Sequence, residues 1–110
     1  MNRHTIKPLI KTCFKPGIAE TEVLLGIKSE KPNLISLRLS NAGLTTVTVS
    51  VTLEVENVGY SLAIEEAVDS KKSIVIDLSE TPVGESDRLL VNANADNTIE
   101  AILICAVSGQ

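Results

Sequence analysis

The chain has 110 residues, a net charge of −4 and 44% hydrophobic residues, but only 2% of its residues are aromatic. This length corresponds to one domain, which can bury a core without the help of a disulfide or a metal ion. The net negative charge argues against a sequence-independent grip on nucleic acid, so no specific nucleic-acid partner is predicted.

No stretch reaches the roughly 20 consecutive apolar residues that a membrane-spanning helix needs. The first residues also lack the apolar centre of a secretory signal, because Lys7 and Lys11 interrupt the only candidate, Pro8-Leu9-Ile10. We therefore expect a protein that is made in the cytoplasm, stays reduced there and has no membrane partner.

Residues 1–17 are predicted to form a basic N-terminal arm or a first edge strand. Pro8 and Pro16 cannot donate to a sheet ladder, which restricts the segment to an edge or to an extended surface path. The segment holds no acidic residue, and its basic residues are Arg3, Lys7, Lys11 and Lys15. All 14 acidic residues of the chain lie in residues 18–110. This uneven distribution of charge predicts a basic arm on an acidic body, and it is equally consistent with a solvated basic segment that has no partner.

Two strands are predicted next. In residues 20–27, Val23 and Leu25 alternate with Glu22 and Leu24. In residues 34–41, one face of the strand holds Ile35, Leu37 and Leu39, and the other holds Ser36, Arg38 and Ser40. We expect Asn41-Ala42-Gly43 to form a short hairpin connection, because Asn and Gly tolerate positive φ.

The strongest strand signal lies in residues 45–56, which read TTVTVSVTLEVE. Aliphatic residues alternate with polar ones at a period of two, which predicts a long strand with one buried and one solvated side. The solvated side is predicted to present Thr46, Thr48, Ser50 and Thr52.

Four more strands are predicted, over residues 59–64, 73–78, 88–93 and 98–107. The first of these places Tyr60, Leu62 and Ile64 on one face. Residues 65–72 read as a polar crossing with at most one helical turn, in which Ala67-Val68 returns to the core. Residues 79–87 read as an acidic loop, and Asp96-Asn97 as a tight turn.

The last predicted strand, residues 98–107, is apolar on both faces, which fits a strand that is covered on both sides. One face holds Ile99, Ala101, Leu103, Cys105 and Val107, and the other holds Ile102, Ile104 and Ala106. We expect the core to cover one face, and the N-terminal arm or a neighbouring subunit to cover the other.

Together these segments predict an all-β fold, a single antiparallel two-sheet sandwich of about seven or eight strands with jelly-roll or immunoglobulin-like connectivity. The sandwich is assigned to residues 18–110, and the extended arm precedes it.

No catalytic, cofactor or metal site is predicted. His4 is the only histidine, and neither a triad nor a zinc site can be assembled around it. Cys105 reads as a small core residue, and Cys13 could approach it only if the first and last strands pair. The acidic residues between 80 and 87, Glu80, Glu85 and Asp87, do not follow the spacing of a calcium loop, and neither do Glu65, Glu66 and Asp69.

Residues 20–108 resemble small virion proteins of tailed bacteriophages, namely capsid decoration (cement) proteins and related head or tail sandwich subunits. Three segments carry the resemblance. They are TEVLLGI running into LISLRLSNAGLTTVTVSV, GYSL leading through Ala67-Val68 to SIVIDL, and Gly84 and Asp87 before LLVNANA and a closing strand that ends in Ala106-Val107-Ser108. In that family the loop reads Gly-Asp directly before the strand, whereas Glu85 and Ser86 intervene here.

The resemblance implies a non-enzymatic structural protein of a virion, a decoration protein that binds and stabilises the assembled head. Its implied partners are the major capsid protein or other virion subunits and further copies of itself, as a homo-oligomer with a trimer favoured. The predicted interface residues are Arg3, Lys7, Lys11, Lys15, Thr46, Thr48, Ser50 and Thr52. Two alternatives remain: a neck, tail or baseplate subunit, and, from another class, a soluble sugar- or protein-binding β-sandwich module.

Overall fold

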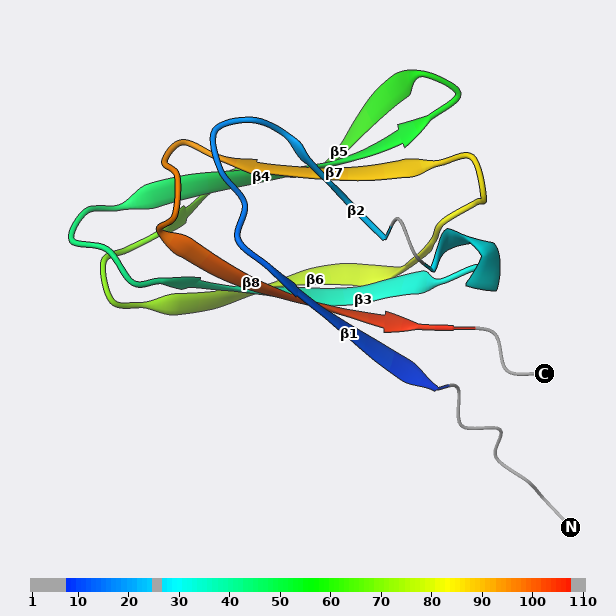
Figure 1. Ribbon diagram of the computed structural model, residues 1–110, viewed down its shortest axis with the longest axis horizontal. Coiled ribbons are helices and arrows are strands. Elements are labelled where there is room, and N and C mark those ends of the chain that lie inside the picture. The colour runs from blue at the N-terminus through cyan, green and yellow to red at the C-terminus, as the bar shows by residue number, and fades with distance from the viewer. Residues whose placement is uncertain (1–7, 25–26, 108–110) are drawn as a thin grey trace, which may run out of the picture.

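The protein is an all-β domain, as a computed structural model shows for residues 8–24 and 27–107 (Figure 1). No α-helix occurs in these residues, and the only helical turn is a 3-10 turn at Lys28–Glu30. None of the helical structure in this part of the chain is long and apolar enough to cross a membrane. The strands are β1 (Leu9–Phe14), β2 (Thr21–Val23), β3 (Asn33–Asn41), β4 (Val47–Val55), β5 (Val58–Val68), β6 (Ser73–Pro82), β7 (Arg88–Ala93) and β8 (Ile99–Ala106).

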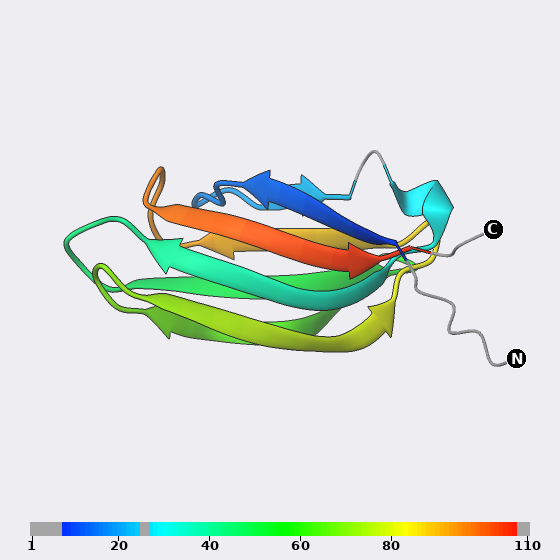
Figure 2. The same cartoon turned by 90° about the horizontal axis from the view of Figure 1, so that it is seen from below.

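The strands form two antiparallel four-stranded sheets, ordered β1-β8-β3-β6 and β2-β7-β4-β5. Strand β4 pairs with β5, β3 with β6, β2 with β7 and β1 with β8, so the chain is one long hairpin wrapped into two layers. Figure 2 shows the first sheet face-on, with β1 along one edge and β6 along the other. The predicted sandwich is therefore confirmed, and its connectivity is that of a jelly roll.

The core between the sheets is aliphatic. Val47, Val49, Val51 and Leu53 from β4 are all buried, which confirms the alternation predicted for this stretch. Strand β8 contributes the alternating set that starts at Ile99, and Cys105 is buried with it. Phe14 is the one aromatic ring that packs against this cluster.

Strand β1 is an edge strand. It covers residues 9–14, and its pairing with β8 places Lys11 opposite Ile104. Residues 1–7, which include Arg3, His4 and Lys7, lie outside the described part of the chain.

Two early strands differ from their prediction. Strand β2 contains only Thr21–Val23, because Leu24 adopts a left-handed conformation with φ of 74° that ends the pleat. In β3 the register shifts between Leu34 and Ser36, so Leu34 is fully buried and Ile35 is not the core residue that strict alternation predicted. A bulge of this kind changes the face on which side chains lie.

The predicted hairpin at Asn41-Ala42-Gly43 is wrong, because β3 and β4 lie in different sheets. Neither Asn41 nor Gly43 has a positive φ. The chain instead turns a corner around Asn41, whose side chain is buried. Its Nδ2 donates to the carbonyls of Thr45 and Val68, both at 2.8 Å, and its Oδ1 accepts from the Gly43 amide at 2.8 Å.

Strands β5 and β6 are longer than predicted. β5 continues through the segment read as a polar crossing, so that Val68 enters the core as expected while Tyr60 and Ile64 remain exposed. Its start forms a hairpin end with β4 that projects from the two layers at the upper right of Figure 1. β6 extends to Pro82, so residues 79–82 of the predicted acidic loop belong to this strand.

Candidate interaction surfaces

The outer surface of the β1-β8-β3-β6 sheet, called face A, mixes apolar and charged side chains. Register and alternation place the following residues on it: Leu9, Lys11 and Cys13 from β1; Glu100, Ile102, Ile104 and Ala106 from β8; Ser36, Arg38 and Ser40 from β3; and Ser73, Val75 and Asp77 from β6. Leu9 is 67% exposed and Val75 is 64% exposed. Large apolar side chains exposed together on one face are typical of an interaction surface.

The apolar residues of face A were only partly predictable. The doubly apolar sequence of β8 indicated Ile102, Ile104 and Ala106, and the structure places Ile102 and Ile104 half-buried on the outer surface, whereas Ala106 is buried. Leu9 and Val75 were not predicted as part of an interaction surface, because the sequence does not show that β1 and β6 lie in one sheet with β8 and β3.

A shallow hollow of about 350 Å³ lies at one end of the β1–β8 pair. Cys13, Phe14, Lys15, Glu100, Ala101 and Ile102 line it. Lys15 and Glu100 are both exposed, so a basic and an acidic side chain border an otherwise apolar hollow.

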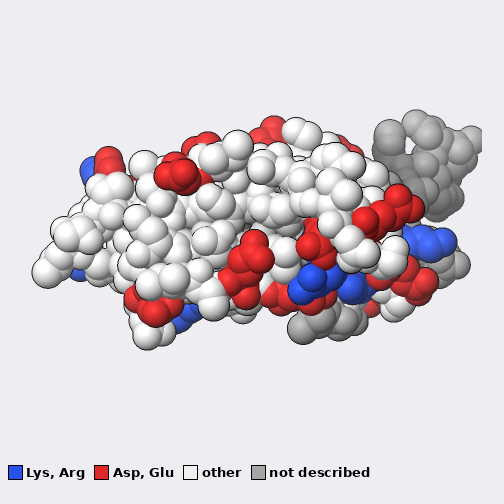
Figure 3. Space-filling model, turned by 90° about the horizontal axis from the view of Figure 1, so that it is seen from above, with Lys and Arg blue, Asp and Glu red and all other residues white. Residues whose placement is uncertain are grey.

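The outer surface of the other sheet, called face B, is largely polar and uncharged. Its members are Glu22 from β2; Arg88, Leu90 and Asn92 from β7; Thr48, Ser50, Thr52 and Glu54 from β4; and Ser61 and Ala67 from β5. Figure 3 looks onto this face and shows a broad area of uncharged residues, with acidic atoms scattered around it and lysine and arginine atoms toward both ends. Such a surface is suited to hydrogen bonding with a partner.

Some of the predicted hydroxyl groups are used within the fold. Ser50 Oγ accepts a hydrogen bond from the Glu65 amide at 2.9 Å, where β5 bulges away from β4. Thr46 lies just before β4, and its Oγ1 donates to Asp69 Oδ1 at 3.1 Å. Within the described residues, the hydroxyls of Thr48 and Thr52 make no hydrogen bond to the protein. Of the four predicted hydroxyl residues, these two are therefore available to bind a partner.

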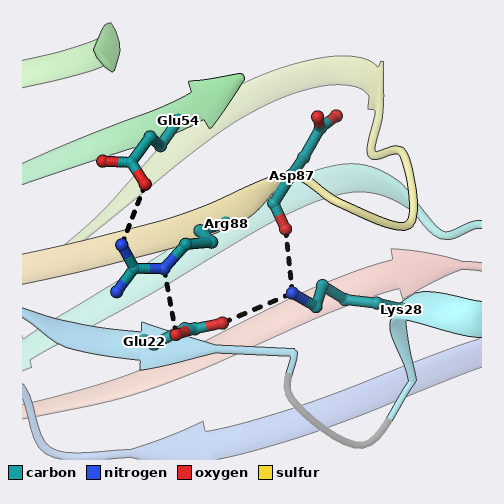
Figure 4. Close-up of polar contacts among 5 residues, drawn as sticks. All are labelled: Glu22, Lys28, Glu54, Asp87 and Arg88. Atoms are coloured by element: carbon teal, nitrogen blue, oxygen red, sulfur yellow. Dashed lines mark hydrogen bonds and ion pairs between the residues drawn. The ribbon is translucent and has the colours of Figure 1, made fainter. Parts of the chain in front are cut away.

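The charged end of face B is an ion-pair network across three adjacent strands (Figure 4). Arg88 Nη1 donates to Glu54 Oε1 at 2.8 Å, and Arg88 Nε donates to Glu22 Oε1 at 3.1 Å. Lys28 Nζ reaches Glu22 Oε2 at 3.4 Å and donates to the Asp87 carbonyl at 3.0 Å. The hydrogen bond from Arg88 holds the pKa of Glu22 below its ordinary value, and Glu54 and Glu22 raise the pKa of Arg88.

The structure does not bring together those predicted interface residues that it describes. Lys11 points outward on face A, and Lys15 is exposed just beyond the end of β1. Thr48, Ser50 and Thr52 lie on face B, on the opposite side of the sandwich. Of the described residues, Lys11 and Lys15 therefore belong to one side of the sandwich, and the hydroxyl residues Thr48, Ser50 and Thr52 belong to the other.

The two cysteines do not meet, although β1 and β8 pair. Cys13 is opposite Ile102 and exposed, whereas Cys105 is opposite Ile10 and buried, so the thiols lie three positions apart and on different faces. Both are free. Burial raises the pKa of the Cys105 thiol to about 11.

The acidic loop closes on itself. Asp87 Oδ2 accepts a hydrogen bond from the Gly84 amide at 2.7 Å, which fixes the turn that leads into β7. No group of three or more His, Cys, Asp or Glu side chains in the described residues is placed to hold a metal ion.

Comparison with known proteins gives a distant structural likeness. No family model matches the chain, and no curated protein matches it. Among solved structures, the chain is similar to the nucleoplasmin-like N-terminal domain of Drosophila FKBP39, with 14% identity and a TM-score of 0.44, over 99% of this chain and 97% of that chain. A likeness this distant says nothing about what the chain does.

Proposed function

We propose that this chain is a non-enzymatic structural subunit of a tailed-phage virion, a capsid decoration (cement) protein that binds and stabilises the assembled head. The observation that carries the proposal is the presence of two unlike surfaces on opposite sides of one thin sandwich, face A and face B. A subunit that clamps neighbours together needs contact surfaces that point in different directions.

Face B is suited to the particle surface. Thr48, Thr52 and Asn92 lie on a hydrogen-bonded sheet, so they do not have to be ordered when they bind. The network around Arg88 ties β2, β7 and β4 together at one end of the same face. A flat, preorganised polar surface is typical of contacts that depend on hydrogen bonds and bridging water.

The basic N-terminal segment supplies charge for a second contact. Lys15 is exposed just beyond the end of β1, and Arg3 and Lys7 precede β1 in the sequence. Complementary charge steers association and fixes register more than it adds affinity. An acidic surface on a neighbouring capsid subunit is the partner that this charge fits.

The assignment to a virion depends on the sequence resemblance and on analogy. Jelly rolls form viral capsid domains and also lectin domains. The alternative of a sugar-binding module is therefore tested alongside the virion proposal.

Quantitative mass spectrometry of purified virions of the phage whose genome encodes the chain tests the proposal. A copy number comparable to that of the major capsid protein is expected for a decoration protein. A copy number that corresponds to a single ring would move the chain to the neck, tail or baseplate, and its absence from virions would overturn the proposal. A glycan-array screen with the purified chain tests the lectin alternative.

Truncation tests the basic segment. A deletion of residues 1–7 leaves all of β1 (Leu9–Phe14) in the chain, whereas a deletion through residue 17 would remove β1, which pairs with β8. We expect the shorter deletion to keep the far-UV spectrum of a β protein and to lower occupancy on heads. Unchanged occupancy would exclude a role for these residues.

A further inference from the structure

We propose that two copies of this chain pair through face A, sheet against sheet, about a two-fold axis. The axis lies between the two stacked sheets, runs parallel to the strands and passes over the gap between β8 and β3. This pairing extends the proposed function, and it rests on the proposed use of face A as a contact surface. It also differs from the three-fold arrangement that the sequence resemblance implies.

The apolar residues of face A require a partner that lies on the sheet. β8 is an interior strand, between β1 and β3, so strand addition at either edge cannot cover its outward Ile102 and Ile104. Leu9 and Val75 extend the same apolar surface toward the two edges. Only a flat surface stacked on face A removes all four side chains from water.

The charges on face A are arranged to complement a second copy of the same face. Residues that lie in register across the four strands form a row, and one such row contains Lys11, Ile104, Ser36 and Asp77. A basic residue therefore lies at one edge of the sheet and an acidic residue at the other. Arg38 and Glu100 add one further charge of each sign near the middle. Among the residues placed on face A, two are therefore positive (Lys11 and Arg38) and two are negative (Asp77 and Glu100).

A two-fold axis between β8 and β3 uses this arrangement. It places β1 over β6 of the second copy, so Lys11 faces Asp77 of the second copy, and the pair occurs twice. It also places β3 over β8 of the second copy, where Glu100 lies two residues from the position opposite Arg38. An isologous contact requires self-complementarity of this kind, and stacked sheets that lie about 10 Å apart are a common packing.

Edge-to-edge contact does not explain the same observations. Joining β1 of one copy to β6 of another would also bring Lys11 near Asp77, but Ile102 and Ile104 would stay in water. The stacked arrangement both pairs the charges and covers the isoleucines.

Charge reversal tests the pairing with the purified chain alone, by sedimentation velocity over a concentration series. We expect wild type to form dimers, and Lys11→Glu and Asp77→Lys each to weaken dimerisation by roughly tenfold or more, because like charges then face each other. The double variant, and an equimolar mixture of the two single variants, should restore the dimer. A mixture that restores only larger species would indicate head-to-tail contacts and overturn the proposal.

Cross-linking tests the register. In the row Cys13, Ile102, Arg38, Val75, the two-fold axis places Cys13 opposite Val75 of the second copy. A short bismaleimide should therefore link Val75→Cys chains into covalent dimers through Cys13. Ile64→Cys is the matched control, because Ile64 is 67% exposed against 64% for Val75 but lies in the other sheet.

Several results would overturn the pairing. These are a monomer at every concentration, a trimer, charge variants that dimerise like wild type, and equal cross-linking of Ile64→Cys or of wild type through Cys13 alone. Head occupancy is measured separately. A monomer that still occupies heads would retain the proposed function, whereas a dimer found on no virion would retain only the pairing.

Discussion

Asn41 Nδ2 donates a hydrogen bond to the carbonyl oxygen of Val68 at 2.8 Å, and this contact joins the end of β3 in one sheet to the end of β5 in the other. Asn41 is 2% exposed, and Val68 is fully buried. The backbone of Asn41 also accepts from the Lys71 amide and donates to the Lys72 carbonyl. One amide side chain therefore fixes the corner at which the two layers meet.

Replacing Asn41 with Ala should lower the free energy of unfolding by about 1–3 kcal/mol, because the carbonyl of Val68 would remain buried without its donor. Urea unfolding followed by far-UV circular dichroism measures the change. Asn92→Ala is the control, since Asn92 is half-buried on face B and should change stability by less than about 0.5 kcal/mol. Equal losses for the two variants would contradict the role given to Asn41.

The two faces of β8 should respond differently to truncation, although both are apolar. Leu103 is fully buried, so Leu103→Ala should cost about 2–5 kcal/mol through lost burial and a cavity. Ile104 is only half-buried on face A, so Ile104→Ala should cost roughly 1 kcal/mol in the monomer. Urea unfolding is measured at low protein concentration, so that self-association does not affect the comparison. A larger loss of stability for Ile104→Ala than for Leu103→Ala would show that the inner and outer faces of β8 are wrongly assigned.

Most of the architecture could be predicted from residue patterns. Residues 45–56 alternate so regularly that only a half-buried strand fits, and β7 begins and ends as predicted at Arg88 and Ala93. The corner at Asn41 could not be predicted, because an Asn before Gly reads as a turn whether the chain folds back in one sheet or crosses to the other. The bulges in β3 and β5 depend on long-range pairing, which local alternation does not contain.

The surfaces were harder to predict than the core. Basic residues and hydroxyl residues could be identified in the sequence, but which of them share a face is decided by the order of strands. Lys11 and Thr48 are on opposite sides because β1 and β4 belong to different sheets. Asp77 became part of a candidate surface only when the register linked it to Lys11 through β8 and β3.

The Arg88 network should make stability depend on pH and salt. Arg88 lowers the pKa of Glu22 in the folded state, so the stabilisation is complete above the ordinary carboxylate pKa. It is lost as the pH falls through the lowered folded value. Arg88→Met should therefore be less stable than wild type at neutral pH, and the difference should shrink on acidification and in about 1 M salt.

Thermal unfolding from neutral to acidic pH measures the effect of the Arg88 network. Lys72→Met serves as the control, because Lys72 is exposed and its side chain makes no ion pair within the described residues. A difference between Arg88→Met and wild type that stays constant from neutral to acidic pH would show that packing, and not the charge of Glu22, accounts for the loss.

The two thiols should differ sharply in reactivity. Thiolate is the nucleophile, and Cys105 is buried with a pKa raised to about 11, so at pH 8 it is both protonated and shielded. Cys13 is exposed on β1. In the folded monomer, at a protein concentration low enough to leave face A uncovered, a thiol-reactive disulfide reagent should titrate one cysteine rapidly, and the second should appear only after denaturation. Cys13→Ser should abolish the fast phase and leave the slow one, whereas two fast thiols in wild type would mean that β8 does not hold Cys105 in the core.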